Sequence, residues 1–184
     1  MKRSSPKIEQ KLLSVNDYSR PGYKLHKLRG IVLHWIGNAG TDAEFNWRYF
    51  ESLKDTKERW ASAHFIIDLD GKVLQIVPLD EVAYHAGPTP DTTETAKKYL
   101  GEWPNGCTIG IEFCHPDWTG KYTQATWDAG VKLCAMLCKQ FNLTECDLYT
   151  HHFITGKDCP RWFVSHPDDL VQFEDDVAGE LLYG

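Results

Sequence analysis

Three side chains that bind zinc well stand far apart in this chain of 184 residues. His34 lies in the apolar run I-V-L-H-W, and the pair His151 and His152 precedes Cys159 in T-H-H-F-I-T-G-K-D-C-P. Two imidazoles and one thiolate make three corners of a zinc tetrahedron. Structural zinc sites fill all four corners with protein, whereas hydrolytic sites leave one open for water. The pattern therefore favours a zinc hydrolase.

Two further residues could take part in such a reaction. Glu112 interrupts the apolar run I-G-I-E-F-C, where an unpaired carboxylate is costly to bury. It is either a strand-edge residue that faces water or a general base that takes a proton from a zinc-bound water. Lys157 lies two residues before Cys159, where its ammonium could stabilise the oxyanion formed when water attacks a carbonyl. Most lysines, however, are simply solvated.

Two other histidines have several interpretations. His64 begins the run H-F-I-I-D, and His85 lies in A-Y-H-A-G. Each could be a third imidazole on the metal, a substrate contact, or a core or loop residue. The spacing also leaves open which member of the pair His151 and His152 binds metal, because neighbours in an extended strand point to opposite faces.

The periodicity of apolar residues predicts the elements that position these side chains. Strands are expected at residues 30–36, 63–69, 72–78, 108–114 and 146–151, with a hairpin turn at Asp70-Gly71. Helices are expected after a capping box at Thr41–Glu44, at 92–100, from Thr123 to Asn142 and from Pro167 to Leu182. Strands and helices alternate, which predicts the α/β class: a single domain with a central mixed β-sheet flanked by helices. Residues 1–27 are expected as an N-terminal arm and residues 28–184 as the catalytic domain.

Composition narrows the classes of protein. The length suits one domain, and 42% hydrophobic with 25% charged residues is typical of a soluble globular chain. A net charge of -6 argues against nucleic acid as a partner, because phosphate binding needs a basic face. No continuous apolar segment follows the basic N-terminus, so we expect neither a signal peptide nor a membrane partner. The six cysteines are expected as free thiols.

Five sequence blocks, taken in order, indicate a family. They are I-V-L-H-W, S-A-H-F-I-I-D-L-D-G, A-Y-H-A-G, T-I-G-I-E-F-C and T-H-H-F-I-T-G-K-D-C-P. With them the chain resembles, over roughly residues 28–175, the zinc-dependent N-acetylmuramoyl-L-alanine amidases of phage endolysins and bacterial autolysins. Those enzymes share their fold with the peptidoglycan recognition proteins. Each block is weak alone, but five in the same order are highly specific.

The resemblance implies a ligand set and a reaction. It implies that His34, His151 and Cys159 bind one Zn²⁺ per chain, with Glu112 as base and Lys157 as oxyanion partner. The implied substrate is bacterial peptidoglycan, cut at the amide between the lactyl group of N-acetylmuramic acid and the L-alanine of the stem peptide. Some relatives use a tyrosine directly before the histidine of the H-F-I-I block. Here that residue is alanine, so its role is absent or passes to the base.

Three other functions were considered beside the amidase. A recognition domain that binds peptidoglycan without cutting it would typically lack the cysteine ligand. A structural zinc site would need a fourth ligand, for which His64 is the candidate. An unrelated zinc peptidase is disfavoured because the chain contains no H-E-x-x-H.

The expected setting is a phage or prophage endolysin that stays in the cytoplasm until host lysis and then acts on the cell wall. Any wall-binding domain would lie outside this chain.

Overall fold

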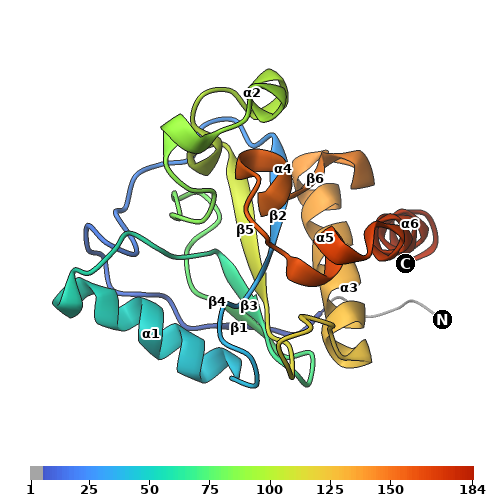
Figure 1. The fold of residues 1–184 in the computed structure, drawn as a ribbon, viewed down its shortest axis with the longest axis horizontal. Helices are drawn as coiled ribbons and strands as arrows, with labels where there is room; N and C mark the ends of the chain where they lie inside the picture. Colours follow the sequence, from blue (N-terminus) through green and yellow to red (C-terminus); the bar gives the residue numbers. More distant parts are fainter. Residues whose placement is uncertain (1–5) are drawn as a thin grey trace.

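A six-stranded sheet runs through the middle of the molecule in the computed structural model, which describes residues 6–184 (Figure 1). In spatial order the strands are β1 (Ile8–Gln10), β4 (Val73–Gln75), β3 (Phe65–Ile67), β5 (Thr108–Phe113), β2 (Gly30–Trp35) and β6 (Leu148–Thr150). Strands β3 and β4 are antiparallel, and the other neighbouring pairs are parallel. The predicted mixed sheet is therefore confirmed.

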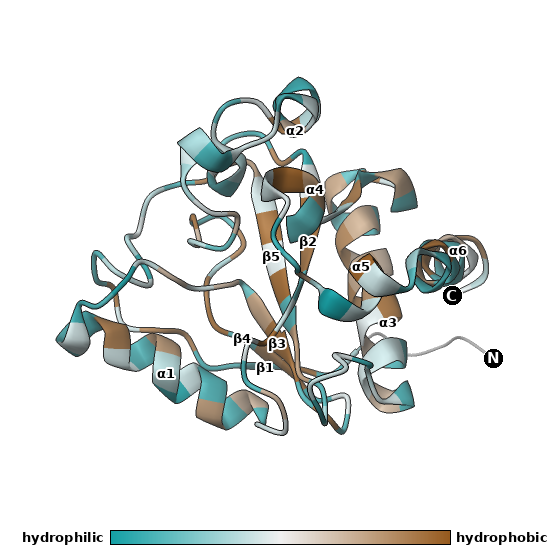
Figure 2. Cartoon of the chain, in the orientation of Figure 1, coloured by the Kyte–Doolittle hydropathy of each residue, from teal (hydrophilic) through white to brown (hydrophobic). Residues whose placement is uncertain are grey.

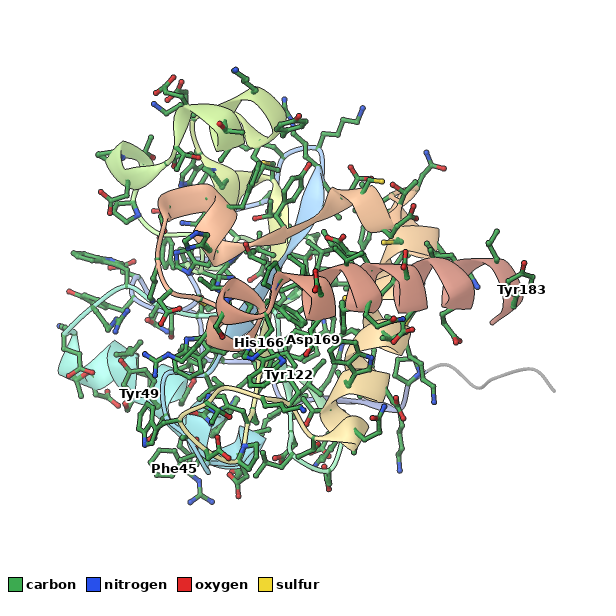
Figure 3. All side chains as sticks on the ribbon, turned by 45° about the vertical axis from the view of Figure 1, so that its right-hand side comes forward. Phe45, Tyr49, Tyr122, His166, Asp169 and Tyr183 are labelled. Carbon is green, nitrogen blue, oxygen red and sulfur yellow. The ribbon has the colours of Figure 1, made fainter. Side chains whose placement is uncertain are left out.

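Helices cover both faces of this sheet (Figure 1). One face packs against α3 (Gln124–Phe141), α5 (Arg161–Ser165) and α6 (Pro167–Tyr183), and its core includes Ile31, Leu33, Ile109 and Ile111. The other face packs against α1 (Ala43–Thr56), while α2 (Glu94–Leu100) and α4 (His151–Thr155) cover the part around Val32. Hydrophobic residues follow β3 and β5 between these layers (Figure 2), whereas Phe45 and Tyr183 extend from the outer helices into solvent (Figure 3).

The predicted hairpin and long helix both form, with shorter strands than expected. Ile67 pairs with Val73 at the end of the antiparallel β3–β4 ladder. Gly71 takes a positive φ of 82° in the turn, which glycine adopts without steric cost. Thr123 caps α3 by accepting a hydrogen bond from the backbone of Thr126, and Asn142 ends that helix in the left-handed conformation. Turn and capping chemistry thus set these boundaries.

The predicted capping box at Thr41–Glu44 is wrong by one residue. Asp42 is the N-cap, and its Oδ1 accepts a hydrogen bond from the backbone N–H of Phe45 at 2.7 Å. Thr41 instead donates its hydroxyl to the carbonyl of Asn38, and the carboxylate of Glu44 pairs with Lys11. A carboxylate at the N-cap also interacts favourably with the helix dipole, which explains why Asp42 takes this position.

The N-terminal segment is more ordered than an irregular arm. Residues 8–10 form β1 and add a parallel edge strand to β4, with Ile8 opposite Val73. Leu13, further along, is buried against the α1 side of the sheet. The division of the chain into residues 1–27 and 28–184 stays a prediction. No helix within residues 6–184 is long and apolar enough to span a membrane.

Candidate metal centre

The register of the sheet brings two of the predicted ligands together. Leu33 of β2 lies opposite Thr150 of β6, so His34 and His151 follow at neighbouring positions. Thr150 ends β6 and caps α4, because its hydroxyl accepts a hydrogen bond from the N–H of Phe153. His151 therefore stands at the first position of a helix, and its ring lies 4.9 Å from that of His34, centroid to centroid.

Cys159 completes the group from the loop that follows α4. Its Sγ lies 3.7 Å from Nδ1 of His34, and the ligand atoms of His34, His151 and Cys159 are all within 4.8 Å of one another. The ligands of a tetrahedral zinc, bound at about 2.0–2.3 Å, stand roughly 3.3–3.7 Å apart. The pair of His34 and Cys159 already has this spacing, and no pair needs to contract by more than about 1 Å. The three residues therefore fit a zinc ion.

Burial sets the protonation of the three ligands. It lowers the pKa of His34 well below the usual value, with further lowering by His151, and that of His151 to about 4. Both rings are therefore neutral near pH 7 and have a lone pair for a metal. Burial and the nearby Glu112 raise the pKa of the Cys159 thiol to about 12, although the backbone N–H of Trp35 donates to the sulfur and opposes this shift. Metal binding would have to displace the thiol proton.

Glu112 lies beside the ligand group. It is the register partner of His34 on the adjacent parallel strand β5. Its Oε2 is buried without a hydrogen-bond partner among the described residues. Burial raises the pKa of this carboxyl to about 8, against the opposing charges of Lys157 and Arg59. A carboxyl that titrates near neutral pH is suited to accept and return a proton.

Lys157 reaches the same group from an exposed position. Its positive charge lowers the pKa values of His34, His151 and Glu112, so its ammonium lies within electrostatic range of all three. The loop that carries it is fixed by His152, whose Nδ1 lies 3.0 Å from the carbonyl oxygen of Lys157. The two neighbouring histidines therefore have different partners: His151 faces the ligand group, and His152 holds the loop.

Comparison with known proteins identifies the family. Residues 24–162 match the family model of the N-acetylmuramoyl-L-alanine amidases, Amidase_2. The chain belongs to this family. A probable N-acetylmuramoyl-L-alanine amidase of Bacillus licheniformis is 32% identical over 175 residues, covering 95% of this chain and 48% of that protein. The amidase BlyA of Bacillus subtilis (strain 168) is 33% identical over 175 residues, covering 92% and 46%.

The chain spans about half the length of these curated relatives. A solved structure, a mutant endolysin from Bacillus subtilis, superposes with a TM-score of 0.70 at 28% identity, covering 94% of this chain and 99% of that one. The α/β architecture expected from the sequence is thus the architecture of an endolysin.

In this member of the amidase family, His64 has no ring nitrogen left for metal or substrate. Its Nδ1 accepts a hydrogen bond from the N–H of Gly110 at 3.0 Å, and its Nε2 lies 2.9 Å from the carbonyl oxygen of Glu81. The side chain is fully buried. His85 is buried too, with its ring nitrogens directed at His34 and Thr108. Of the alternatives left open for these two histidines, this geometry favours supporting roles over substrate contacts.

Three further side chains are neighbours of Glu112 or of Trp35, and the sequence patterns singled out neither Arg59 nor Arg161 among them. The charge of Arg59, in the segment after α1, reaches Glu112. Trp118 is 60% exposed and stands edge-on to Trp35, which follows the ligand His34 in the chain. The guanidinium of Arg161 covers the ring of Trp35 at 4.6 Å. Only spatial proximity distinguishes these side chains from ordinary surface residues.

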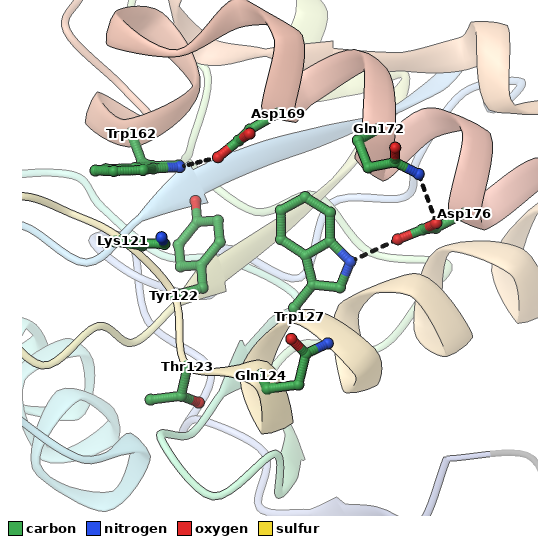
Figure 4. Close-up of a pocket in the computed structure, with 9 residues that line it drawn as sticks. All are labelled: Lys121, Tyr122, Thr123, Gln124, Trp127, Trp162, Asp169, Gln172 and Asp176. Atoms are coloured by element: carbon green, nitrogen blue, oxygen red, sulfur yellow. Dashed lines mark hydrogen bonds between the residues drawn. The ribbon is translucent and has the colours of Figure 1, made fainter.

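A cavity of about 340 Å³ lies elsewhere, between the starts of α3 and α6 (Figure 4). Two of its indoles are hydrogen-bonded to lining carboxylates: Trp127 donates to Asp176 at 2.8 Å, and Trp162 donates to Asp169 at 2.5 Å. None of the seven predicted site residues lines this cavity. The cavity and the ligand group therefore have separate linings.

Proposed function

We propose that this chain is a zinc-dependent lysin that hydrolyses the amide bond between N-acetylmuramic acid and L-alanine in bacterial peptidoglycan. The observation that carries the proposal is the convergence of His34, His151 and Cys159 within 4.8 Å, with Glu112 beside His34 in the sheet register. Membership of the amidase family supports the reaction class. Because the chain spans about half of its curated relatives, the activity and substrate of the whole protein are part of the proposal.

His34, His151 and Cys159 would hold one Zn²⁺ per chain. Bound there, the ion would supply Lewis acidity toward the amide carbonyl and the hydrolytic water. The described part of the chain offers no fourth protein ligand at this group, and both nitrogens of His64 are engaged elsewhere. A three-ligand set is typical of hydrolytic rather than structural zinc sites.

Glu112 is the proposed general base and acid. Its free, buried Oε2 accepts a proton from the water that attacks the carbonyl carbon. When the carbon–nitrogen bond breaks, the carboxyl returns that proton to the nitrogen of the departing L-alanine. The products are a lactyl carboxylate on the sugar and a free amino terminus on the peptide. Because Ala63 precedes His64, no tyrosine hydroxyl competes for this role at that position.

Lys157 is the proposed partner of the oxyanion. The carbonyl oxygen becomes negative as water adds, and a fixed ammonium stabilises that charge more than the neutral ground state. The hydrogen bond between His152 and the Lys157 carbonyl supports this role, because it holds the backbone from which the side chain extends.

The proposed partner is peptidoglycan, and the proposed place of action is the bacterial cell wall. Trp118, exposed beside Trp35, offers an aromatic surface on which a sugar or peptide could stack. Storage in the cytoplasm until lysis and a wall-binding domain outside this chain stay predictions.

Digestion of purified peptidoglycan with mass analysis of the fragments tests the proposal. We expect new L-alanine amino termini on intact glycan strands, lost after verified metal removal and restored by Zn²⁺. New reducing sugar ends would indicate a glycosidase instead. Peptidoglycan binding without any cleavage by the zinc-loaded protein would indicate a recognition domain.

A further inference from the structure

The two ring nitrogens of His34 have different partners. Nδ1 faces Cys159, with its Sγ at 3.7 Å, whereas Nε2 lies 3.1 Å from Nδ1 of His85. Only Nδ1 is therefore directed at the ligand group. A histidine ring binds a metal through a nitrogen that has no proton, so the tautomer of His34 decides whether this orientation is productive.

The hydrogen bonds beyond His85 determine that tautomer. Nε2 of His85 lies 3.3 Å from the hydroxyl oxygen of Thr108 and 3.4 Å from the Thr108 carbonyl oxygen. The Thr108 hydroxyl donates its own proton to the carbonyl of Pro104 at 2.7 Å. Both partners of this nitrogen can therefore only accept, so Nε2 of His85 carries the proton.

The protonation of His85 in turn determines the tautomer of His34. Both rings are buried and their nitrogens face neutral groups, an arrangement that favours neutral imidazoles. A neutral ring protonated at Nε2 has an acceptor at Nδ1. His85 therefore accepts a hydrogen bond from Nε2–H of His34, and Nδ1 of His34 keeps its lone pair toward Cys159.

The ring of His85 is held in place by its surroundings. The side-chain oxygen of Asn105 accepts hydrogen bonds from the backbone N–H groups of His85, at 3.0 Å, and Ala86, at 2.8 Å. The ring packs directly on the backbone of β5 at Gly110, where an added Cβ would lie 2.5 Å from Cγ of His85. Asn105 holds the backbone of His85, and Gly110 packs against its ring, so the acceptor nitrogen has a fixed position. A residue that orients a metal ligand needs such a fixed acceptor.

We propose that His85 is a positioning residue of the metal centre: it holds His34 in the Nε2–H tautomer and thereby presents Nδ1 to the ion. Thr108 and Pro104 form the far end of the same hydrogen-bond chain. The inference rests on the proposed function only in taking His34 as a metal ligand. It is favoured over a substrate contact, one of the alternatives for His85, because the residue is only 7% exposed.

Zinc affinity of three variants, measured by competition with a chromophoric chelator, tests the proposal. His85→Leu removes the acceptor, and we expect Zn²⁺ to bind about 10–100-fold more weakly. His85→Asn offers an oxygen near the position of Nδ1 and should retain most of the affinity. His115→Asn is the matched control, a buried histidine whose ring nitrogens face only backbone carbonyl oxygens, and should bind zinc like the wild type. Equal affinities for His85→Leu and wild type, or an equal loss in His115→Asn, would overturn the proposal.

The tautomer itself provides a second measurement that needs no variant. Long-range ¹H–¹⁵N correlation spectra of the metal-free wild type should show His34 and His85 protonated at Nε2. A His34 protonated at Nδ1 would refute the proposed role, whether or not the variants fold. Neither measurement uses turnover. A wild type with the expected tautomers and zinc affinity but no amidase activity would contradict the proposed function alone.

Discussion

His34 and Glu112 lie directly opposite each other on the parallel strands β2 and β5. This pairing places a candidate metal ligand and a candidate base on the same face of the sheet. A slip of one residue in either strand would turn one of the two side chains to the opposite face, because strand side chains alternate. The β2–β5 register therefore fixes the geometry of the centre.

Replacement of Glu112 by Gln should separate catalysis from metal binding. The amide keeps the shape of the carboxyl but cannot accept a proton, so we expect kcat to fall by about 10²–10⁴-fold. The zinc content should stay at the wild-type level, because Glu112 is not a ligand. Release of L-alanine amino termini measures the activity, and the exposed Glu102→Gln is the control. Normal cleavage by the Glu112 variant would show that another group is the base.

Replacement of Lys157 by Met should reduce stabilisation of the transition state more than it reduces substrate binding. The change keeps the apolar stem but removes the charge, so we expect kcat to fall by about 10²–10³-fold with little change in KM. Lys98→Met, on the exposed side of α2, is the control. A rise in KM with unchanged kcat would assign Lys157 to substrate binding instead.

Replacement of Cys159 by Ser should abolish zinc retention. A hydroxyl is a much poorer zinc ligand than a thiolate, so we expect affinity to fall by more than the ~100-fold typical of outer-shell changes. Metal analysis after gel filtration gives the result, and the exposed Cys146→Ser should keep its zinc. A full complement of zinc in the Cys159 variant would exclude the thiol as a ligand.

Stability should fall in acid partly because of His64. Burial lowers the pKa of this ring from 6.5 to about 4, so the unfolded chain binds the proton more readily than the folded one. The contribution of His64 to the free energy of unfolding is fully present above pH 6.5 and is lost as the pH falls toward 4. Between pH 8 and pH 5 this amounts to about 2 kcal/mol of unfolding free energy.

The measurement is urea unfolding of the metal-free protein at several pH values. His64→Asn should lose less stability between pH 8 and pH 5 than the wild type, because the amide does not titrate. Parallel pH dependence in the two proteins would mean that His64 does not contribute.

Local patterns in the sequence determined most of the elements. Helix α3 and strands β2 and β5 were predictable because apolar periodicity, a capping threonine at 123 and short apolar runs depend only on near neighbours. The candidate residues were also visible, since imidazole, thiolate and carboxylate have known chemistry. The choice between Thr41 and Asp42 as N-cap could not be predicted, because threonine and aspartate both cap helices well.

The tertiary structure alone decided how these residues act on one another. His34 meets His85 across 51 residues of chain and Cys159 across 125, and no local pattern specifies which ring nitrogen faces which partner. Likewise, His151 and His152 differ because one starts a helix beside β2 while the other bonds to the Lys157 loop. Residue types and short-range spacing are encoded locally, whereas register, burial and hydrogen-bond direction arise only when distant segments pack together.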